Sequence, residues 1–195
     1  MSDNELVFEV ENDENVSVSN VNNGDSLPEP ANSLESTMDG ILPPWVQRYP
    51  GVFQTPFPPK SPHLYGHIEA SVLDSGVAPN TVIKVGDDWY VDIYWSLKGT
   101  LMPLIYGKWC IRLHLESMGR GKEFNYPRKG REIYVRANPC GNGYYRYRVK
   151  VPAGTVTAKH HGIPYKLVVS VTFYDYCGEP GRITGVVEGP ILYFS

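Results

Sequence analysis

Hydrophobic and polar residues alternate strictly in several segments of the last two-thirds of the chain. The clearest case is residues 89–98, where Trp89, Val91, Ile93, Trp95 and Leu97 alternate with Tyr90, Asp92, Tyr94, Ser96 and Lys98. Successive side chains of a β-strand point to opposite faces of its sheet, so one set faces a core and the other faces solvent. The pattern predicts a strand that is buried on one face only.

The same period of two recurs along the chain and predicts strands at 67–73, 89–98, 108–117, 131–136, 144–151, 165–174, 182–188 and 191–194. Turns rich in Gly, Pro and Asn separate these segments, and no stretch of ten residues has helical periodicity. Seven or eight short strands in about 130 residues are typical of an all-β fold, an antiparallel two-sheet immunoglobulin-like β-sandwich. We therefore assign residues 67–195 to a β-sandwich domain.

Residues 41–66 form a Pro/aromatic-rich segment, here called the strap. Proline is too frequent in it for a helix or a central strand, which favours an extended, polyproline-like chain. Its large aromatic side chains are Trp45, Tyr49, Phe53 and Phe57. Because these rings are unfavourable in water, we expect them to lie on the domain's own surface or on a neighbouring protein.

Residues 1–40, here called the arm, contain ten acidic residues and no Lys or Arg, whereas the rest of the chain has 18 basic and 11 acidic residues. Low hydrophobicity with charge of one sign predicts an arm that is flexible by itself. One β-prone patch, Leu6–Val10, interrupts it and includes Phe8 and Val10. The patch is either a chance group of apolar residues or a strand that pairs with a partner's sheet edge.

Several classes of protein are disfavoured. Basic residues are spread through the domain rather than clustered, so we expect no nucleic-acid binding. The start of the chain lacks the features of a signal peptide, and no apolar run approaches about 18 residues, so we expect a cytoplasmic protein without a transmembrane segment. Three cysteines in no C-x-x-C pair are interpreted as reduced thiols.

Sequence motifs for catalysis were not found. The chain has no P-loop, no G-x-S-x-G and no H-E-x-x-H, and the segment 119–122 (Gly-Arg-Gly-Lys) is interpreted as a hairpin loop. The pair His160 and His161 is a poor metal site, because adjacent side chains in an extended chain point in opposite directions. We expect no enzymatic activity, no metal or cofactor and no small-molecule substrate.

Aromatic residues on the outer faces of the predicted strands are the strongest remaining signal. Tyr90 and Tyr94 share one outer face, and Tyr144 stands near Arg146 and Arg148. Tyr and Arg are favoured at protein interfaces, and aromatic rings also stack on sugars. The alternative is cross-strand pairing of tyrosines on a solvated sheet.

The order of strands and turns from about residue 85 to 195 resembles a group of small β-sandwich proteins. That group is associated with gene clusters for phage-tail-like contractile injection systems in cyanobacteria and other bacteria. The resemblance rests on Trp89-x-Val91-x-Ile93-x-Trp95-x-Leu97-x-Gly99, Gly107-x-Trp109, Glu116-Ser117-x-Gly119-x-Gly121-x-Glu123, 152–156, 165–169 and 187–190. These are core tryptophans and turn glycines, so no catalytic residue carries over.

The resemblance implies a structural subunit, such as a cap, plug, baseplate or adaptor, within a symmetric particle. The expected partner-binding residues are Phe8, Val10, Trp45, Tyr49, Phe53, Phe57, Tyr144, Arg146 and Arg148. The alternative function is a glycan- or surface-binding module that uses exposed aromatic rings as stacking platforms. Exposed aromatics along a concave groove would favour the alternative, and a flat patch of them would favour assembly.

Overall fold

The structure is a computed structural model that describes residues 47–75, 78–156 and 162–195. Phe8, Val10, Trp45 and the His160–His161 pair lie outside these residues, so their predicted roles stay predictions. The elements are β1 (Tyr49–Pro50), β2 (Val52–Gln54), β3 (Tyr65–Asp74), β4 (Ala78–Pro79), β5 (Val82–Ile83), β6 (Trp89–Lys98), the short 3₁₀ helix η1 (Met102–Leu104), β7 (Gly107–Ser117), β8 (Phe124–Tyr126), β9 (Ile133–Arg136), β10 (Tyr144–Val151), β11 (Pro164–Asp175) and β12 (Pro180–Phe194).

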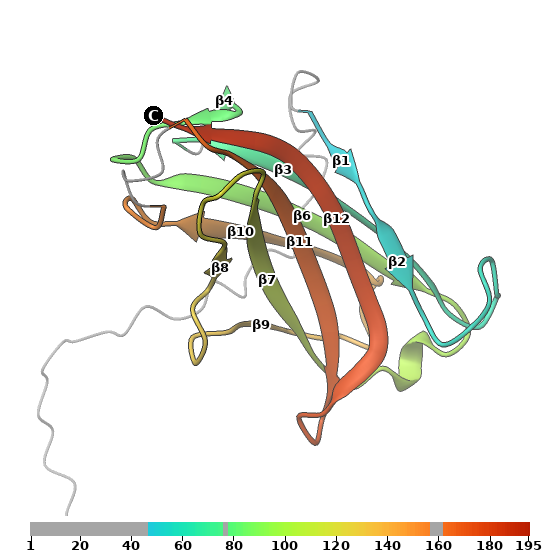
Figure 1. The fold of residues 1–195 in the computed structure, drawn as a ribbon. Helices are drawn as coiled ribbons and strands as arrows, with labels where there is room; N and C mark the ends of the chain where they lie inside the picture. The colour runs from blue at the N-terminus through green and yellow to red at the C-terminus, as the bar shows by residue number, and fades with distance from the viewer. Residues whose placement is uncertain (1–46, 76–77, 157–161) are drawn as a thin grey trace, which may run out of the picture. The chain divides into compact units, whose positions relative to one another are not determined.

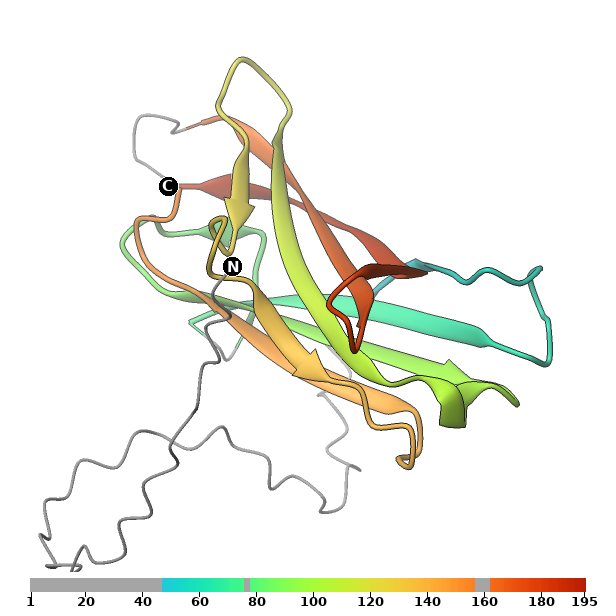
Figure 2. The same cartoon turned by 90° about the horizontal axis from the view of Figure 1, so that it is seen from below.

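Two sheets pack face to face, which confirms the predicted all-β sandwich (Figure 1). Sheet A has the strand order β1-β3-β6-β10, with β4 paired to β3. Sheet B has the order β2-β12-β11-β7-β8, with β5 paired to β12 and β9 paired to β7. All pairs are antiparallel except the short parallel pair of β5 and β12. The long strands of sheet B curve across the layer formed by β3, β6 and β10 (Figure 2).

The core lies between the sheets and follows the predicted alternation. Trp95 and Trp109 are 2% and 0% exposed, and their rings meet edge to face with centroids 6.0 Å apart. The inward residues of β11, Leu167, Val169 and Val171, are fully buried against them. Burial of this apolar surface supplies the main driving force for folding, because each large side chain contributes about 1.5–3 kcal/mol.

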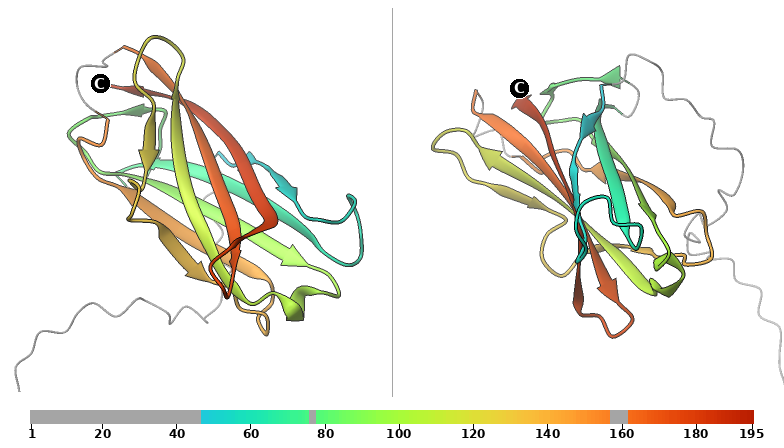
Figure 3. Two further views of the ribbon diagram at one scale, coloured as in Figure 1. Left: turned by 60° about the horizontal axis from the view of Figure 1, so that its bottom comes forward. Right: turned by 90° about the vertical axis from the view of Figure 1, so that its right-hand side faces the viewer.

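The strap forms β1 and β2, which the sequence did not predict as strands. β1 pairs with β3 in sheet A, and β2 pairs with β12 in sheet B, so the strap crosses from one sheet to the other and closes one long side of the sandwich (Figure 3). Both strands are short and lie at sheet edges, the positions in which a Pro-rich chain can pair without interrupting a ladder. The strap therefore belongs to the same folded unit as the sandwich.

The last strand also differs from the prediction. Residues 182–188 and 191–194 were expected to be two strands, but they are parts of the single strand β12. Gly189 and Pro190 together lie opposite Leu167 of β11, so the register shifts there by one residue. A bulge of this kind accommodates a proline, which has no N–H to donate, without ending the strand.

Candidate protein-docking surface

The outer face of sheet A carries tyrosine, arginine and carboxylate side chains in two adjacent cross-strand rows. One row contains Ser71 of β3, Asp92 of β6 and Arg148 of β10, which are directly opposite one another in the ladder. The next row contains Glu69, Tyr94 and Arg146 on the same three strands. Because directly opposite side chains on one face lie about 4.5–5.5 Å apart at Cβ, the register brings these charges into contact.

Asp92 is the centre of this surface and is 0% exposed, although it points away from the core. Its carboxylate accepts hydrogen bonds from Arg148 Nε at 2.5 Å and Arg148 Nη2 at 2.8 Å, and from Arg146 Nη2 at 3.2 Å. A bidentate guanidinium contact fixes both distance and orientation. The pair of arginines thus compensates a buried charge that would otherwise be strongly destabilising.

Two tyrosines flank the carboxylate and stack with the arginines. The guanidinium carbon of Arg146 lies 5.0 Å from the ring centroid of Tyr94, and that of Arg148 lies 6.0 Å from the centroid of Tyr90. The guanidinium carbon of Arg48, from the strap, also lies over the Tyr94 ring, 5.6 Å from its centroid. Burial, followed by the nearby Asp92 carboxylate, raises the pKa of Tyr94. We call Arg48, Asp92, Tyr90, Tyr94, Arg146 and Arg148 the Asp92 network.

Two hydroxyl groups at the centre of this face, both within the described residues, are buried and have no hydrogen-bond partner. They are the hydroxyl oxygens of Ser71 and Tyr94. Burying a hydroxyl without a partner is unfavourable, and most buried hydroxyls in proteins are satisfied. Both hydroxyl oxygens are closed off from solvent, so the centre of this face is tightly packed.

Ion pairs extend the surface at both ends. Arg48 Nη1 lies 2.7 Å from Glu69 Oε1, and Lys150 Nζ lies 2.6 Å from Asp88 Oδ2. Asp88 also accepts a hydrogen bond from the backbone N–H of Ala153 at 2.9 Å. The hydrogen bond from Lys150, with that from Ala153, holds the pKa of Asp88 below its ordinary value.

Tyr144 is the most exposed aromatic residue of this face, at 59%. Its ring centroid lies 4.8 Å from Lys98 Nζ of the neighbouring strand β6. A cation over the ring face restricts the tyrosine without burying it. The result is a large, positioned and solvent-accessible side chain of the type favoured at protein interfaces.

The structure divides the predicted site residues into separate groups. Tyr144, Arg146 and Arg148 lie together on the outer face of β10, as their alternation predicts. The strap aromatics instead contact their own domain: Tyr49, Phe53 and Phe57 are half-buried and pack against its core. The sequence left their location open between the domain and a neighbour.

Phe53 shows why the strap aromatics turn inward. A Cβ on Gly66 would come within 2.3 Å of the Phe53 ring, and one on Gly185 within 2.8 Å. Two glycines, one from each sheet, thus leave the space that the ring fills, and the ring meets Trp109 edge to face at 6.1 Å. Phe53 is therefore a half-buried residue that packs against the core, and its role in partner binding stays a prediction.

Sequence reasoning missed the central role of Asp92 and the contributions of Arg48 and Glu69. One signal in the sequence could have indicated it: the outward residues of one predicted strand, Tyr90-x-Asp92-x-Tyr94, are complementary in charge and ring stacking to those of another, Arg146-x-Arg148-x-Lys150. Only the register of β6 and β10 shows that these patterns meet.

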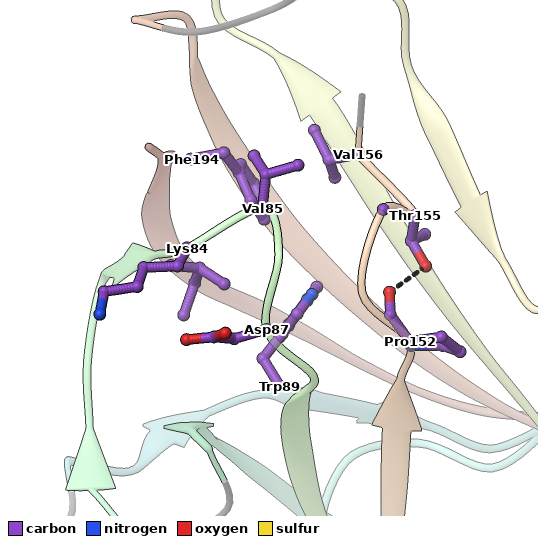
Figure 4. A pocket seen from close by; sticks show the side chains of 10 residues that line it. Lys84, Val85, Asp87, Trp89, Pro152, Thr155, Val156 and Phe194 are labelled. Carbon is purple, nitrogen blue, oxygen red and sulfur yellow. Dashed lines mark hydrogen bonds between the residues drawn. The ribbon is translucent and has the colours of Figure 1, made fainter. Parts of the chain in front are cut away.

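Two depressions in the described surface differ in size, and neither is an enclosed cavity; the larger has a volume of about 410 Å³. One lies between residues 83–89, 152–156 and Phe194, where Thr155 Oγ1 donates a hydrogen bond to the Pro152 carbonyl at 2.6 Å, and it has no room for a water molecule (Figure 4). Another, lined by Ser75, Gly86, Asp87, Asp88 and Tyr90, is shallow and open. In the described ranges, no group of three His, Cys, Asp or Glu residues is arranged to hold a metal ion.

No helix in the described part of the chain has the length and apolarity needed to cross a membrane. The three thiols differ in environment, since Cys110 is buried and Cys140 and Cys177 are exposed. Burial raises the pKa of Cys110, so its thiolate is disfavoured.

Comparison with known proteins finds neither a family model that matches the chain nor a curated protein with a matching sequence.

Proposed function

We propose that the protein is a structural subunit of a larger protein assembly, of the phage-tail-like contractile injection type that the sequence resemblance implies, and that it docks through the outer face of sheet A. In this proposal the sandwich is a rigid, non-catalytic block. The Asp92 network holds the face in one conformation, and Tyr144 supplies an exposed contact beside it.

The observation that carries the proposal is the Asp92 network itself. A carboxylate that is 0% exposed on the outer face of a sheet is held by two partly exposed arginines, which fixes the orientation of both guanidinium groups. Arginine and tyrosine side chains held in fixed rotamers lose little entropy on binding, which favours interface formation. The surface is thus prepared for a flat protein partner.

The alternative function, binding of glycans through stacked aromatics, has less support. Neither described depression is lined by a group of exposed aromatic rings. The exposed tyrosines are instead distributed over several elements: Tyr65 and Tyr144 on sheet A, Tyr134 and Tyr193 on sheet B, Tyr106 before β7 and Tyr176 in the β11–β12 turn. A sugar-binding groove requires such rings side by side.

The test is purification of the full-length tagged protein from its native host, followed by identification of the proteins that co-purify. We expect other structural subunits of one particle in fixed ratios. Tyr144→Ala should lower their recovery without lowering the melting temperature, because the ring is exposed. Recovery of no structural subunit with the intact protein would contradict the proposed function.

A matched control is available on the other sheet. Tyr134→Ala removes a ring that is 44% exposed and that also carries a lysine over its face, Lys108 Nζ at 4.0 Å. This variant should recover the partners as well as the wild type does. Equal losses for both variants would show that sheet A is not the specific docking face.

A further inference from the structure

One long side of the sandwich remains open, in contrast to the side that the strap closes. β10 ends sheet A on this side, and β8 and β9 border sheet B. The side chains along it are only partly buried against the core, namely Tyr126, Ile133, Val135, Tyr145 and Tyr147. The ring of Tyr145 lies 5.7 Å from that of Trp109 in β7, so residues of the two sheets meet along this line. We call these five residues the seam.

The backbone of β10 beside the seam is unpaired on its outer edge. The Leu97 N–H donates a hydrogen bond to the Gly143 carbonyl at 2.8 Å, so Gly143 and Leu97 form a hydrogen-bonded pair of the ladder. Gly143 has φ +76°, and a Cβ there would lie 2.1 Å from the Leu97 oxygen, so only glycine fits. In an antiparallel ladder the hydrogen-bonded pairs alternate, so residues 145, 147 and 149 bond to β6. The N–H and C=O groups of Arg146, Arg148 and Lys150 therefore point to the free edge, where no described strand pairs with them.

This edge differs from the other sheet edges in length and charge. β10 is eight residues long, whereas β1, β2, β8 and β9 have two, three, three and four. Its outward side chains after Tyr144 are Arg146, Arg148 and Lys150, all exposed. A long, regular edge is a template for an added strand. Its three cations already face two carboxylates, Asp92 and Asp88, so one net positive charge remains to favour an acidic strand.

The arm contains a strand-length segment with the complementary pattern. Alternate side chains of residues 5–11 are Glu5, Val7, Glu9 and Glu11 on one side and Leu6, Phe8 and Val10 on the other. A strand added to the β10 edge shares both faces of sheet A. Its glutamates would then lie beside the basic outer face, and its apolar residues would cover the seam.

From this two-sided match we infer that residues 5–11 of the arm of a second copy of this chain add to the free edge of β10 as an extra strand of sheet A. The inference rests on the proposed assembly function and names one contact within it. Arms exchanged between neighbouring copies would link them in a chain or ring, and repetition around a symmetric particle would add avidity.

The length of the chain allows a second copy to be the source of the arm. From Val10 to Gln47, 36 residues intervene, which can extend to about 120 Å. Sheet A, from β1 to β10, is only three strand spacings wide, about 14 Å. A domain of this size is roughly 40 Å across, so the linker is also long enough to reach the β10 edge of a neighbouring domain.

The experiment uses full-length protein with the photo-cross-linker p-benzoylphenylalanine in place of Phe8. A second, differently tagged copy without the cross-linker is co-expressed, so that any cross-link between copies is identified by mass spectrometry. We expect cross-links from position 8 to residues 144–151 and to the seam of the second copy. The same cross-linker in place of Tyr176, which is 86% exposed in the β11–β12 turn, should give none at these residues.

A charge-matched pair of variants tests the role of the glutamates. Glu5→Lys, Glu9→Lys and Glu11→Lys combined should lower the cross-link yield by about tenfold, the effect of losing several weak ion pairs. Asp25→Lys, Glu29→Lys and Glu35→Lys combined change the net charge equally and should leave the yield unchanged. An equal loss for both sets would overturn the two-sided match, because net charge alone would then control binding.

Other outcomes separate this inference from the proposed function. Cross-links only within one chain, or to other elements of the second copy, would overturn it even if particles form, and the basic edge would then serve only to prevent unwanted strand pairing. Assembly without any cross-link to β10 would have the same meaning. If the native protein co-purifies with no structural subunit, the proposed function fails irrespective of the cross-linking result.

Discussion

The two long sides of the sandwich are built in opposite ways. On one side the strap crosses from sheet A to sheet B, and Phe53 fills the gap between Gly66 and Gly185. On the other side β10 is the last strand of sheet A, and no described strand pairs with its outer edge. Its inward residues Tyr145 and Tyr147 are only half-buried. The chain completes its core where it supplies its own edge segment. On the side where the chain supplies no edge segment, the β10 edge carries basic side chains and the seam stays partly exposed.

The difference shows how one sandwich combines a stable core with a surface for docking. Both sides converge on Trp109, whose ring contacts Phe53 from the closed side at 6.1 Å and Tyr145 from the open side at 5.7 Å. Burial is complete at the centre and decreases toward the open edge. Stability is therefore expected to depend strongly on the centre and the closed side, and weakly on the open side.

The largest effect is expected at the centre. Trp109→Ala and Trp95→Ala should each lower the free energy of unfolding by about 3–5 kcal/mol, the usual cost of deleting a large buried aromatic ring. Urea denaturation followed by circular dichroism measures the change. A loss below 1 kcal/mol at Trp109 would mean that the two sides do not share one core.

The next effect compares the two sides directly. Phe53→Ala should lower the free energy of unfolding by about 3 kcal/mol, because the ring fills the space that Gly66 and Gly185 leave between the two sheets. Tyr147→Ala on the open side should cost only about 1 kcal/mol, since its half-buried ring is already partly hydrated. Urea denaturation of both variants gives the ratio, and equal losses would contradict the distinction between a closed and an open side.

On the outer face of sheet A, the Asp92 network should respond asymmetrically to the loss of the carboxylate or of an arginine. Arg148→Met leaves a carboxylate that is 0% exposed with one remaining arginine, so the free energy of unfolding should fall by about 2 kcal/mol. Asp92→Asn leaves arginines that reach water, so the loss should be about 1 kcal/mol. Thermal denaturation tests the order, and a greater loss for Asp92→Asn would show that the arginines depend on the carboxylate more than the carboxylate depends on Arg148.

The smallest effect concerns acid titration beside β10. Since the pKa of Asp88 is lower in the folded state than its ordinary value of 3.8, the Lys150–Asp88 pair stabilises the fold above that value. This contribution is lost as the pH falls through the folded pKa. Carbon-detected NMR titration should show the pKa of Asp88 rising in Lys150→Met.

The ion pair of Lys166 with Glu188 on sheet B is the control for this titration. The hydrogen bond from Lys166 lowers the pKa of Glu188. Lys166→Met should therefore raise the pKa of Glu188 and leave that of Asp88 unchanged. If Lys150→Met leaves the pKa of Asp88 where it was, the backbone hydrogen bond from Ala153 holds it alone.

The local alternation of the sequence determined most of the strands and their inner and outer faces. Trp95 and Tyr144 were placed on opposite faces because side-chain direction in a strand follows from position alone. The strands of the strap were not predicted, because segments of two and three residues contain too little alternation to detect. The bulge at Gly189–Pro190 was read as a break for the same reason, since its continuity depends on pairing with β11.

What the sequence by itself determined was the set of inward and outward residues on each strand, together with an acidic arm and a basic domain. Only the tertiary structure decided which strands are neighbours. The register of β6 and β10 brought Asp92 to Arg146 and Arg148, and the path of the strap turned Phe53 into the core. Hydrophobic patterning is local and periodic, whereas cross-strand contacts join residues more than 50 positions apart, which no local pattern encodes.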